Sequence, residues 1–169
     1  MNVSLVGIEE EFIHQWGVLG SSWGINKTMA QIHALLLIKK DALTTDDIME
    51  QLTISRGNAH SNIKQLLDWS LIRKVIKKGQ RKEFFLAEKD PWKIFCIITN
   101  QRKRRELEPL VAILDQCTND LKKLKSKDAV QLQTQLKELT KFINTGVSVM
   151  DKLAKSNQSV LMKLIMKIL

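Results

Sequence analysis

Polar side chains recur along one face of the short helix that is predicted to follow Ser55. With about 100° between successive residues, one stripe of this helix is polar and the opposite face is apolar. The stripe contains Asn58, Ser61, Asn62 and Gln65. Amide and hydroxyl groups both donate and accept hydrogen bonds, which is the chemistry that distinguishes base edges in the major groove of DNA. A solvated surface helix is the alternative, although such helices are usually richer in Glu and Lys.

Basic residues flank this stripe and continue into a predicted β-hairpin. Arg56 and Lys64 stand where the phosphates of a bound duplex would lie. The hairpin is expected to have strands at 71–78 and 81–86, because these residues are β-branched and partly alternating, with a turn at Gly79-Gln80. Its tip carries Lys77, Lys78, Arg81 and Lys82. Such a basic wing suits contact with the DNA backbone or the minor groove.

The net charge is concentrated in the same region. Residues 55–82 hold eight lysines and arginines against one aspartate, a net charge of +7, whereas the whole chain carries +9. A protein that displaces counterions from phosphates needs such a concentration. A chain that was basic merely for solubility would spread its charge.

Capping signals place the polar helix second in a helix-turn-helix. Thr44 can cap the first helix, and Asp47, three residues later, can complete a capping box. A turn at 53–54 follows, and Ser55 caps the second helix. The core-facing residues of the two helices are Ile48, Leu52, Ala59, Ile63, Leu66 and Leu67. The order of helix, turn, helix and hairpin is that of a winged helix-turn-helix, whose usual partner is duplex DNA.

Helices are also expected on both sides of this motif. We expect residues 1–24 to form an N-terminal helix for dimerisation or packing, residues 25–90 the winged helix, with a helix at about 27–38, and residues 91–169 a helical dimerisation region. The N-terminal helix has an apolar stripe that is too broad for a small winged helix to bury, so C-terminal helices of the same chain or of a partner should cover it. The stripe contains Ile8, Phe12, Trp16, Leu19 and Trp23. The fold class is therefore mainly α with a small β-hairpin.

The C-terminal region is predicted to begin with a helix at Asp90-Pro91 and to kink or restart at Pro109. From Ala129 the apolar residues alternate in steps of three and four, which predicts a coiled-coil or bundle seam. The seam contains Ala129, Leu132, Leu136, Leu139, Ile143, Gly146, Met150 and Leu153. Two-fold dimers of this design place two recognition helices about 34 Å apart on a palindromic site. Formation of a homodimer is thus expected to be part of the mechanism.

Composition argues against several other classes of protein. No apolar run approaches the length of about 20 residues that a membrane span needs, and the apolar segment 160–169 is expected to pack on a partner helix. The amino terminus lacks a secretory signal, so a cytoplasmic location is expected. Cys96 and Cys117 have no His or Cys at ligand spacing, which predicts no metal site, disulfide or cofactor. Without a phosphate loop, nucleophile elbow or metalloprotease motif, no enzyme is expected.

The winged-helix residues resemble those of the GbsR branch of the MarR-type bacterial regulators. The resemblance covers roughly residues 8 to 115 and rests on the segments 55–64, 67–69, 71–74, 78–85, 88–92 and 102–109. It implies a homodimeric transcriptional regulator, usually a repressor, whose DNA affinity a small effector can change. One departure is Ser70, where similar sequences usually have a glycine that ends the recognition helix.

The resemblance also carries DNA contact over to named positions. In the helix these are Ser55, Arg56, Asn58, Ser61, Asn62 and Lys64, and in the wing they are Gly79, Gln80, Arg81 and Lys82. The residue pattern itself adds Gln65, Lys77 and Lys78 and, at the start of the first helix, Thr44 and Thr45. Double-stranded DNA is accordingly the expected partner.

An effector site is predicted where aromatic residues gather. Quaternary ammonium ions are typically held in aromatic cages. The candidates are Phe12, Trp16, Trp23, Trp92 and Phe95. The preferred place is the junction between the first helix and the helix starting at Trp92, and the alternative is that these residues are plain core.

Two other functions remain open on the sequence alone. A winged helix can serve as a protein-interaction module, with the basic hairpin docking an acidic partner. The polar stripe argues against this function, because protein interfaces favour aromatic and aliphatic anchors. A non-specific nucleoid-type binder would explain the charge but not the stripe.

Overall fold

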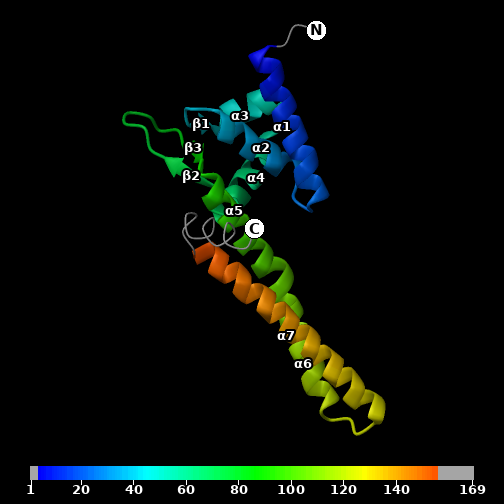
Figure 1. Ribbon diagram of the computed structural model, residues 1–169. Coiled ribbons are helices and arrows are strands. Elements are labelled where there is room, and N and C mark those ends of the chain that lie inside the picture. Colours follow the sequence, from blue (N-terminus) through cyan, green and yellow to red (C-terminus); the bar gives the residue numbers. More distant parts are fainter. Residues whose placement is uncertain (1–3, 156–169) are drawn as a thin grey trace, which may run out of the picture. The chain divides into compact units, whose positions relative to one another are not determined.

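A computed structural model describes residues 4–155 of the chain (Figure 1). The chain divides into two compact units, residues 1–94 and residues 95–169. The first unit contains both the expected N-terminal helix and the expected winged helix. No helix in the described part is long and apolar enough to cross a membrane. The apolar segment 160–169 lies outside the described residues.

The first unit has the element order of a winged helix preceded by one further helix. Its three-stranded antiparallel sheet has the order β1-β3-β2, with Leu43 and Lys74 on either side of Phe85. The elements are α1 (Leu5–Ser22), α2 (Lys27–Ile38), β1 (Leu43–Thr44), α3 (Thr45–Leu52), α4 (Arg56–Asp68), β2 (Ile72–Val75) and β3 (Phe84–Ala87). The predicted fold class is confirmed.

The predicted capping residues start the two helices of the helix-turn-helix. The Asp47 N–H donates to Thr44 Oγ1 at 3.2 Å, and the Thr44 N–H donates to Asp47 Oδ2 at 2.8 Å, which completes the capping box of α3. The Asn58 N–H donates to Ser55 Oγ at 3.4 Å, so Ser55 caps α4. Ser70, just after α4, is left-handed with φ 63°. A serine in this conformation costs about 1 kcal/mol relative to glycine.

The core of the first unit surrounds α2. Ile32 is fully buried, and α2 contacts α1, α3, α4 and β3. Lys89, just after β3, closes the end of α2, because its Nζ donates to the backbone oxygens of Leu36 at 3.1 Å, Leu37 at 2.6 Å and Lys39 at 2.5 Å. Carbonyls at a helix end have no partner within the helix, so this ammonium group satisfies them.

The N-terminal helix packs on α2 mainly through residues that lie outside the predicted apolar stripe. The buried residues of α1 are Ile13, Gly17 and Gly20. A Cβ atom at Gly20 would lie 2.6 Å from the Cβ of Ala30, so glycine is required for this close approach. Residues of the predicted stripe are exposed instead, with Ile8 at 55%, Leu19 at 40% and Trp23 at 54%. The first unit thus leaves much of this stripe uncovered, and its expected cover by C-terminal helices of the same chain or of a partner stays a prediction.

The wing has shorter strands than the sequence predicts. β2 and β3 pair from Ile72 and Ala87 to Val75 and Phe84, which leaves residues 76–83 as a loop that projects beyond the helices of this unit (Figure 1). Ile76 is 93% exposed, so no packing favours a longer strand. Gly79 has φ 80° and forms the predicted turn in this loop. The two-residue strand β1 was too short to be predicted from periodicity.

The second unit contains a helix pair. After Asp90, which accepts the Trp92 N–H at 2.9 Å, the helix α5 (Pro91–Arg102) leads through a π-helical turn, η1 (Lys103–Leu107), into α6 (Glu108–Leu121). α7 (Lys127–Lys155) lies beside α6 (Figure 1). Pro109 explains the widened turn, since its nitrogen cannot donate a hydrogen bond and its ring displaces the preceding carbonyl. The predicted restart at Pro109 is confirmed in this form.

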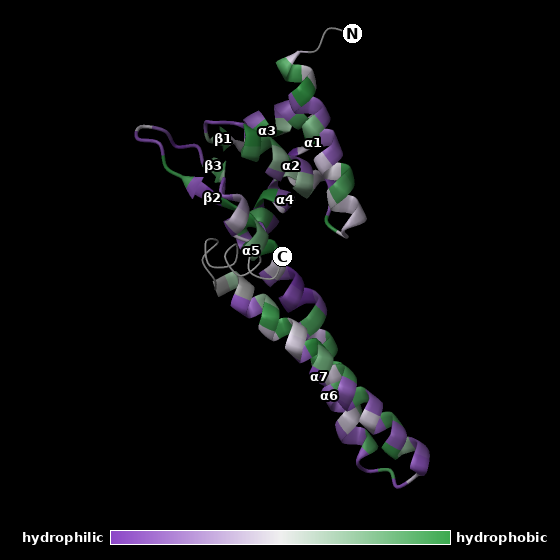
Figure 2. Cartoon of the chain, in the orientation of Figure 1, coloured by the Kyte–Doolittle hydropathy of each residue, from purple (hydrophilic) through white to green (hydrophobic). Residues whose placement is uncertain are grey.

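The predicted seam on α7 is only partly covered by α6. Ala129 is buried, Leu136 and Ile143 are partly buried, and Gln133 Nε2 donates to the Thr118 carbonyl of α6 at 3.2 Å. Other apolar residues of α7 are exposed, with Leu132 at 45%, Leu139 at 44%, Phe142 at 77% and Val149 at 50%. Figure 2 shows that apolar residues run along the length of the α6–α7 pair. This pair therefore covers only one edge of the seam.

We predict that Gly20→Ala destabilises the protein by about 1–3 kcal/mol, because the added methyl group overlaps Ala30. Gly57→Ala is the control, and it should raise the free energy of unfolding. Its Cβ would meet no atom within 4 Å, and alanine favours the helix by up to about 1 kcal/mol. Urea denaturation without DNA measures both effects. A Gly20→Ala variant as stable as the wild type would contradict the packing of α1 on α2.

Candidate nucleic-acid interface

The exposed face of α4 carries the predicted polar stripe, with one exception. Asn58, Ser61 and Gln65 are exposed. Asn62 is only 2% exposed. It lies about 40° further round the helix than Asn58, toward the arc that buries Ile63. The prediction that Asn62 reads a base edge is therefore corrected, because its amide does not reach the surface.

Asn62 instead orients Asn58. Its Nδ2 donates to the Asn58 carbonyl at 2.8 Å and to Asn58 Oδ1 at 2.7 Å. Asn58 Nδ2 in turn donates to Thr28 Oγ1 on α2 at 3.4 Å. Within the described residues Asn62 Oδ1 has no hydrogen-bond partner. The buried amide thus fixes the rotamer of its exposed neighbour.

Thr44, predicted to contact DNA, is occupied at the start of α3. It is 6% exposed, and its hydroxyl donates to Asp47 Oδ2 at 2.8 Å. Hydrogen bonds from the Thr44 N–H and then from its hydroxyl lower the pKa of Asp47 below its ordinary value of 3.8. Thr44 therefore positions the helix and offers no hydroxyl to a phosphate, which corrects the prediction. Thr45, the first residue of α3, is partly exposed.

Asp46, which no sequence pattern singled out, joins two of the predicted DNA contacts. Its Oδ1 accepts from Arg56 Nη2 at 2.9 Å, and its Oδ2 accepts from Lys82 Nζ at 3.0 Å. The hydrogen bond and charge of Lys82, followed by those of Arg56, lower the pKa of Asp46. These partners are 10 and 36 positions away, so only the fold reveals the cluster.

The wing presents several cations from a short base. Lys74 pairs with Glu83 at 2.6 Å, and Lys77 Nζ lies 4.2 Å from the ring centroid of Phe84, where the cation is attracted by the aromatic face. Among the described residues, the cations of segment 55–82 that form no ion pair are Lys64, Arg73, Lys77, Lys78 and Arg81. These side chains can meet phosphates without first breaking an ion pair.

The fold matches that of a solved structure, and the sequence is similar to those of two known proteins. No protein-family model matches the chain. A crystal structure described as a transcriptional regulator superimposes with a TM-score of 0.68 at 18% identity, covering 86% of this chain and 95% of that one. The HTH-type transcriptional repressor GbsR of Bacillus subtilis (strain 168) is 27% identical to this chain, in an alignment that covers 73% of this chain and 79% of that repressor. The chain is therefore similar to GbsR over most of its length, and its fold is that of a winged helix.

A second relative supports the same resemblance over a shorter span. The putative HTH-type transcriptional regulator YvaV of the same organism is 21% identical over 90 residues, covering 53% of this chain and 51% of that regulator. The resemblance to the GbsR branch that the sequence suggested is thus confirmed.

The aromatic residues predicted to hold an effector come from different elements of the chain. Phe12 and Trp16 are adjacent, with ring centroids 5.4 Å apart, and Trp16 lies 6.4 Å from the ring of His33. Burial lowers the pKa of His33 to about 4, so its imidazole is neutral at pH 7. The remaining candidates are Trp23 at the end of α1 and Trp92 and Phe95 on α5. Because Phe95 belongs to the second unit, the site at this junction stays a prediction.

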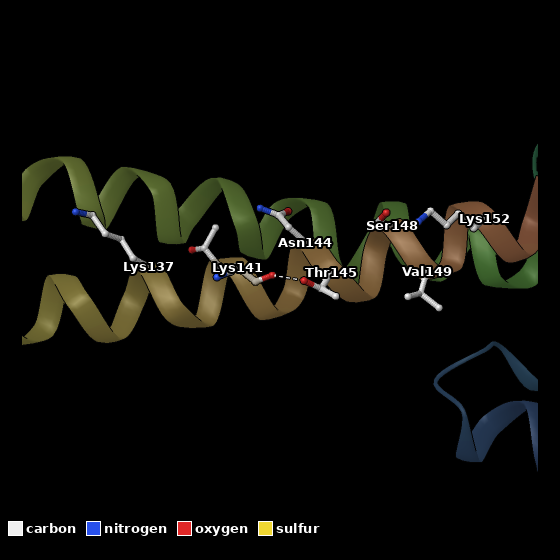
Figure 3. A pocket seen from close by; sticks show the side chains of 8 residues that line it. Lys137, Lys141, Asn144, Thr145, Ser148, Val149 and Lys152 are labelled. Atoms are coloured by element: carbon white, nitrogen blue, oxygen red, sulfur yellow. Dashed lines mark hydrogen bonds between the residues drawn. The ribbon is translucent and has the colours of Figure 1, made fainter. Parts of the chain in front are cut away.

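A basic hollow on α7 was not predicted. Its volume is about 570 Å³, and Figure 3 shows Lys137, Lys141 and Lys152 along it. The hydroxyls of Thr140 and Thr145, also in its lining, donate to backbone carbonyls of their own helix at 2.9 Å. The hollow therefore offers cationic side chains on an open surface, and its threonine donors are already used.

We predict that Asp47→Ala lowers the free energy of unfolding by about 1 kcal/mol at pH 7, because the capping box loses its acceptor. The pKa of Asp47 is below 3.8 in the folded state. The stability that the Asp47 carboxylate contributes is therefore fully present at pH values above its pKa in the unfolded state. It is lost as the pH falls through its pKa in the folded state. Urea denaturation from pH 7 to pH 3 should show the two proteins converging only at the acid end. A difference that is constant with pH would contradict the role of the carboxylate.

Proposed function

We propose that this chain is a homodimeric, sequence-specific transcriptional repressor that binds a palindromic operator in duplex DNA. One observation carries the proposal: α4 exposes Asn58, Ser61 and Gln65 in the same winged helix that presents cations without ion-pair partners. The names of the relatives support it, since GbsR is named a repressor and YvaV a putative regulator, and neither is named an enzyme. A DNA partner would place its action in the cytoplasm.

In the proposed complex, α4 occupies the major groove. Gln65 is well suited to base reading, because its amide can bond N6 and N7 of adenine together. Ser55 and Arg56 stand at the amino-terminal end of α4, where the helix dipole attracts a phosphate. Lys78 and Arg81 reach the backbone or the minor groove from the wing. The helix would thus supply specificity and the wing would supply most of the electrostatic affinity.

Dimerisation is proposed to use the uncovered edge of the α6–α7 pair. Leu132, Leu139 and Phe142 are 45%, 44% and 77% exposed, and Ile113 of α6 is 58% exposed. Neighbouring exposed apolar side chains that form a patch often mark an interface. A second copy offers the same apolar edge, which satisfies a two-fold contact. A small effector contacting Phe12 and Trp16 would act on the resulting dimer.

The interaction-module alternative is less well supported by the same surface. The centre of the exposed face of α4 is polar, and the prominent side chains of the wing are cationic. An interface with another protein would place aromatic and aliphatic anchors there.

We predict that Gln65→Ala and Arg81→Ala affect DNA binding in different ways. Gln65→Ala should reduce the preference for the operator by the equivalent of about 1–3 kcal/mol and leave binding to random DNA unchanged. Arg81→Ala should weaken binding to all sequences and reduce the slope of log K against log salt by about 1. Fluorescence anisotropy with upstream and random fragments over a salt series measures both.

The control for this pair is Lys40→Ala, which removes one charge from an exposed loop outside the proposed interface. It should leave the salt slope close to that of the wild type. Unchanged DNA affinity in both Gln65→Ala and Arg81→Ala would contradict the proposed function.

We predict that Leu139→Glu shifts the protein from dimer to monomer and raises the dissociation constant for the operator at least about tenfold, because a buried unpaired charge is strongly unfavourable. Thr134→Glu, on an exposed part of α7 about 140° away, adds the same charge and should leave the dimer intact. Analytical ultracentrifugation distinguishes the two. A dimer that persists in Leu139→Glu would place the interface elsewhere.

A further inference from the structure

Asp46 is an acidic residue placed inside the surface that is proposed to meet DNA. Each of its carboxylate oxygens accepts a hydrogen bond from a different cation, Oδ1 from Arg56 at 2.9 Å and Oδ2 from Lys82 at 3.0 Å. Arg56 begins the recognition helix, and Lys82 lies in the wing loop. One carboxylate therefore joins α3, α4 and the wing at the point where all three would face a duplex.

These ion pairs are exposed and therefore exchangeable. The side chains of Asp46, Arg56 and Lys82 are 47%, 72% and 65% exposed. Exposed pairs of this kind contribute little to folding, because water and salt screen them and ordering the side chains opposes them. A DNA phosphate offers the same cations a stronger charge-assisted contact. The carboxylate and a phosphate thus compete for the same two partners.

Competition of this kind affects specific and non-specific DNA unequally. Binding to random DNA depends almost entirely on cations that displace counterions from phosphates. Binding to an operator adds base contacts from α4, which hold phosphates beside Arg56 and Lys82 long enough to replace the carboxylate. Asp46 neutralises Arg56 and Lys82 in the free protein. This pairing therefore lowers the affinity for random DNA more than the affinity for the operator.

We infer that Asp46 is a specificity-determining residue, which competes with DNA phosphate for Arg56 and Lys82 and so suppresses binding to random sequence. The inference rests on the proposed function, since it requires that Arg56 and Lys82 meet DNA. Charge from both cations keeps the pKa of Asp46 low, so the carboxylate remains ionised throughout the neutral range. No protonation step is needed for the exchange.

The test compares Asp46→Asn with the wild type on operator and random fragments over a salt series. The variant should bind random DNA about three- to tenfold more tightly at low salt, with a salt slope steeper by about 1 to 2, because two cations are released. Affinity for the operator should rise less, so the ratio of specific to random binding should fall.

The matched control is Asp68→Asn, at the last residue of the same helix α4. It removes the same charge about 18 Å from the start of the helix, which is beyond the screening length of about 8 Å at physiological salt. Asp68→Asn should leave both affinities within about twofold of the wild type.

A second comparison distinguishes competition from simple repulsion between Asp46 and DNA. In an Arg56→Ala, Lys82→Ala background, Asp46→Asn should change random-DNA affinity less than about twofold, because no cation remains to be released. Thermal unfolding of each variant confirms that the fold is retained.

Three results would overturn the inference. Random-DNA affinity that is unchanged or lower in Asp46→Asn would show that the carboxylate does not compete. A gain that persists in the double-alanine background would show repulsion alone. Wild-type protein that binds no DNA at all would overturn the proposed function together with this inference, whereas the first two results leave the proposed function standing.

Discussion

Thr44 is the residue at which the sheet and the helix-turn-helix are joined. Its backbone pairs with Phe84 in β3, and its N–H and hydroxyl form the capping box with Asp47 at the start of α3. Because one buried residue serves both elements, the first turn of α3 is fixed relative to the base of the wing. That turn places Asp46, and Asp46 in turn holds Arg56 and Lys82. The geometry of the candidate interface therefore depends on a local hydrogen-bond pair beneath it.

The interface combines rigid and exchangeable contacts. Beneath the surface, the buried amide of Asn62 fixes Asn58, and Lys89 closes the end of the central helix α2 through backbone carbonyls. Above it, ion pairs to Asp46 and Glu83 are solvent-exposed and weak. A surface that must change its partners from carboxylates to phosphates requires this division. The side chains that exchange partners are held in place by side chains that do not.

Signals that act over a few residues were readable from the sequence. The helix at 27–38, the caps Thr44, Ser55 and Asp90 and the turn at Gly79 all depend on neighbours within four positions. Features that depend on distant partners were not readable. The buried face of α1 follows from the contact of Gly20 with Ala30, and the pairing of Asp46 follows from the position of the wing.

Errors about single residues have equally definite causes. Asn62 is polar and falls near the polar stripe, but an offset of about 40° is enough to bury it beside Ile63. Thr44 can hydrogen-bond a phosphate only if its hydroxyl is not already used in a cap. Periodicity located the seam on α7, yet it could not tell which edge α6 would cover. The side chain of Leu139 is exposed, although the pattern gives it the same weight as the partly buried Ile143.

The wing loop combines exposure with a high density of lysine and arginine. Residues 76–83 stand outside the sheet and carry Lys77, Lys78, Arg81 and Lys82, the residue types after which trypsin-like proteases cleave. Exposed loop tips are preferred sites of proteolytic nicking. A duplex lying over the wing would shield these peptide bonds, while the unbound chain leaves them open. If the wing binds a duplex as proposed, trypsin-like proteases would cleave this loop more slowly in bound molecules than in unbound ones.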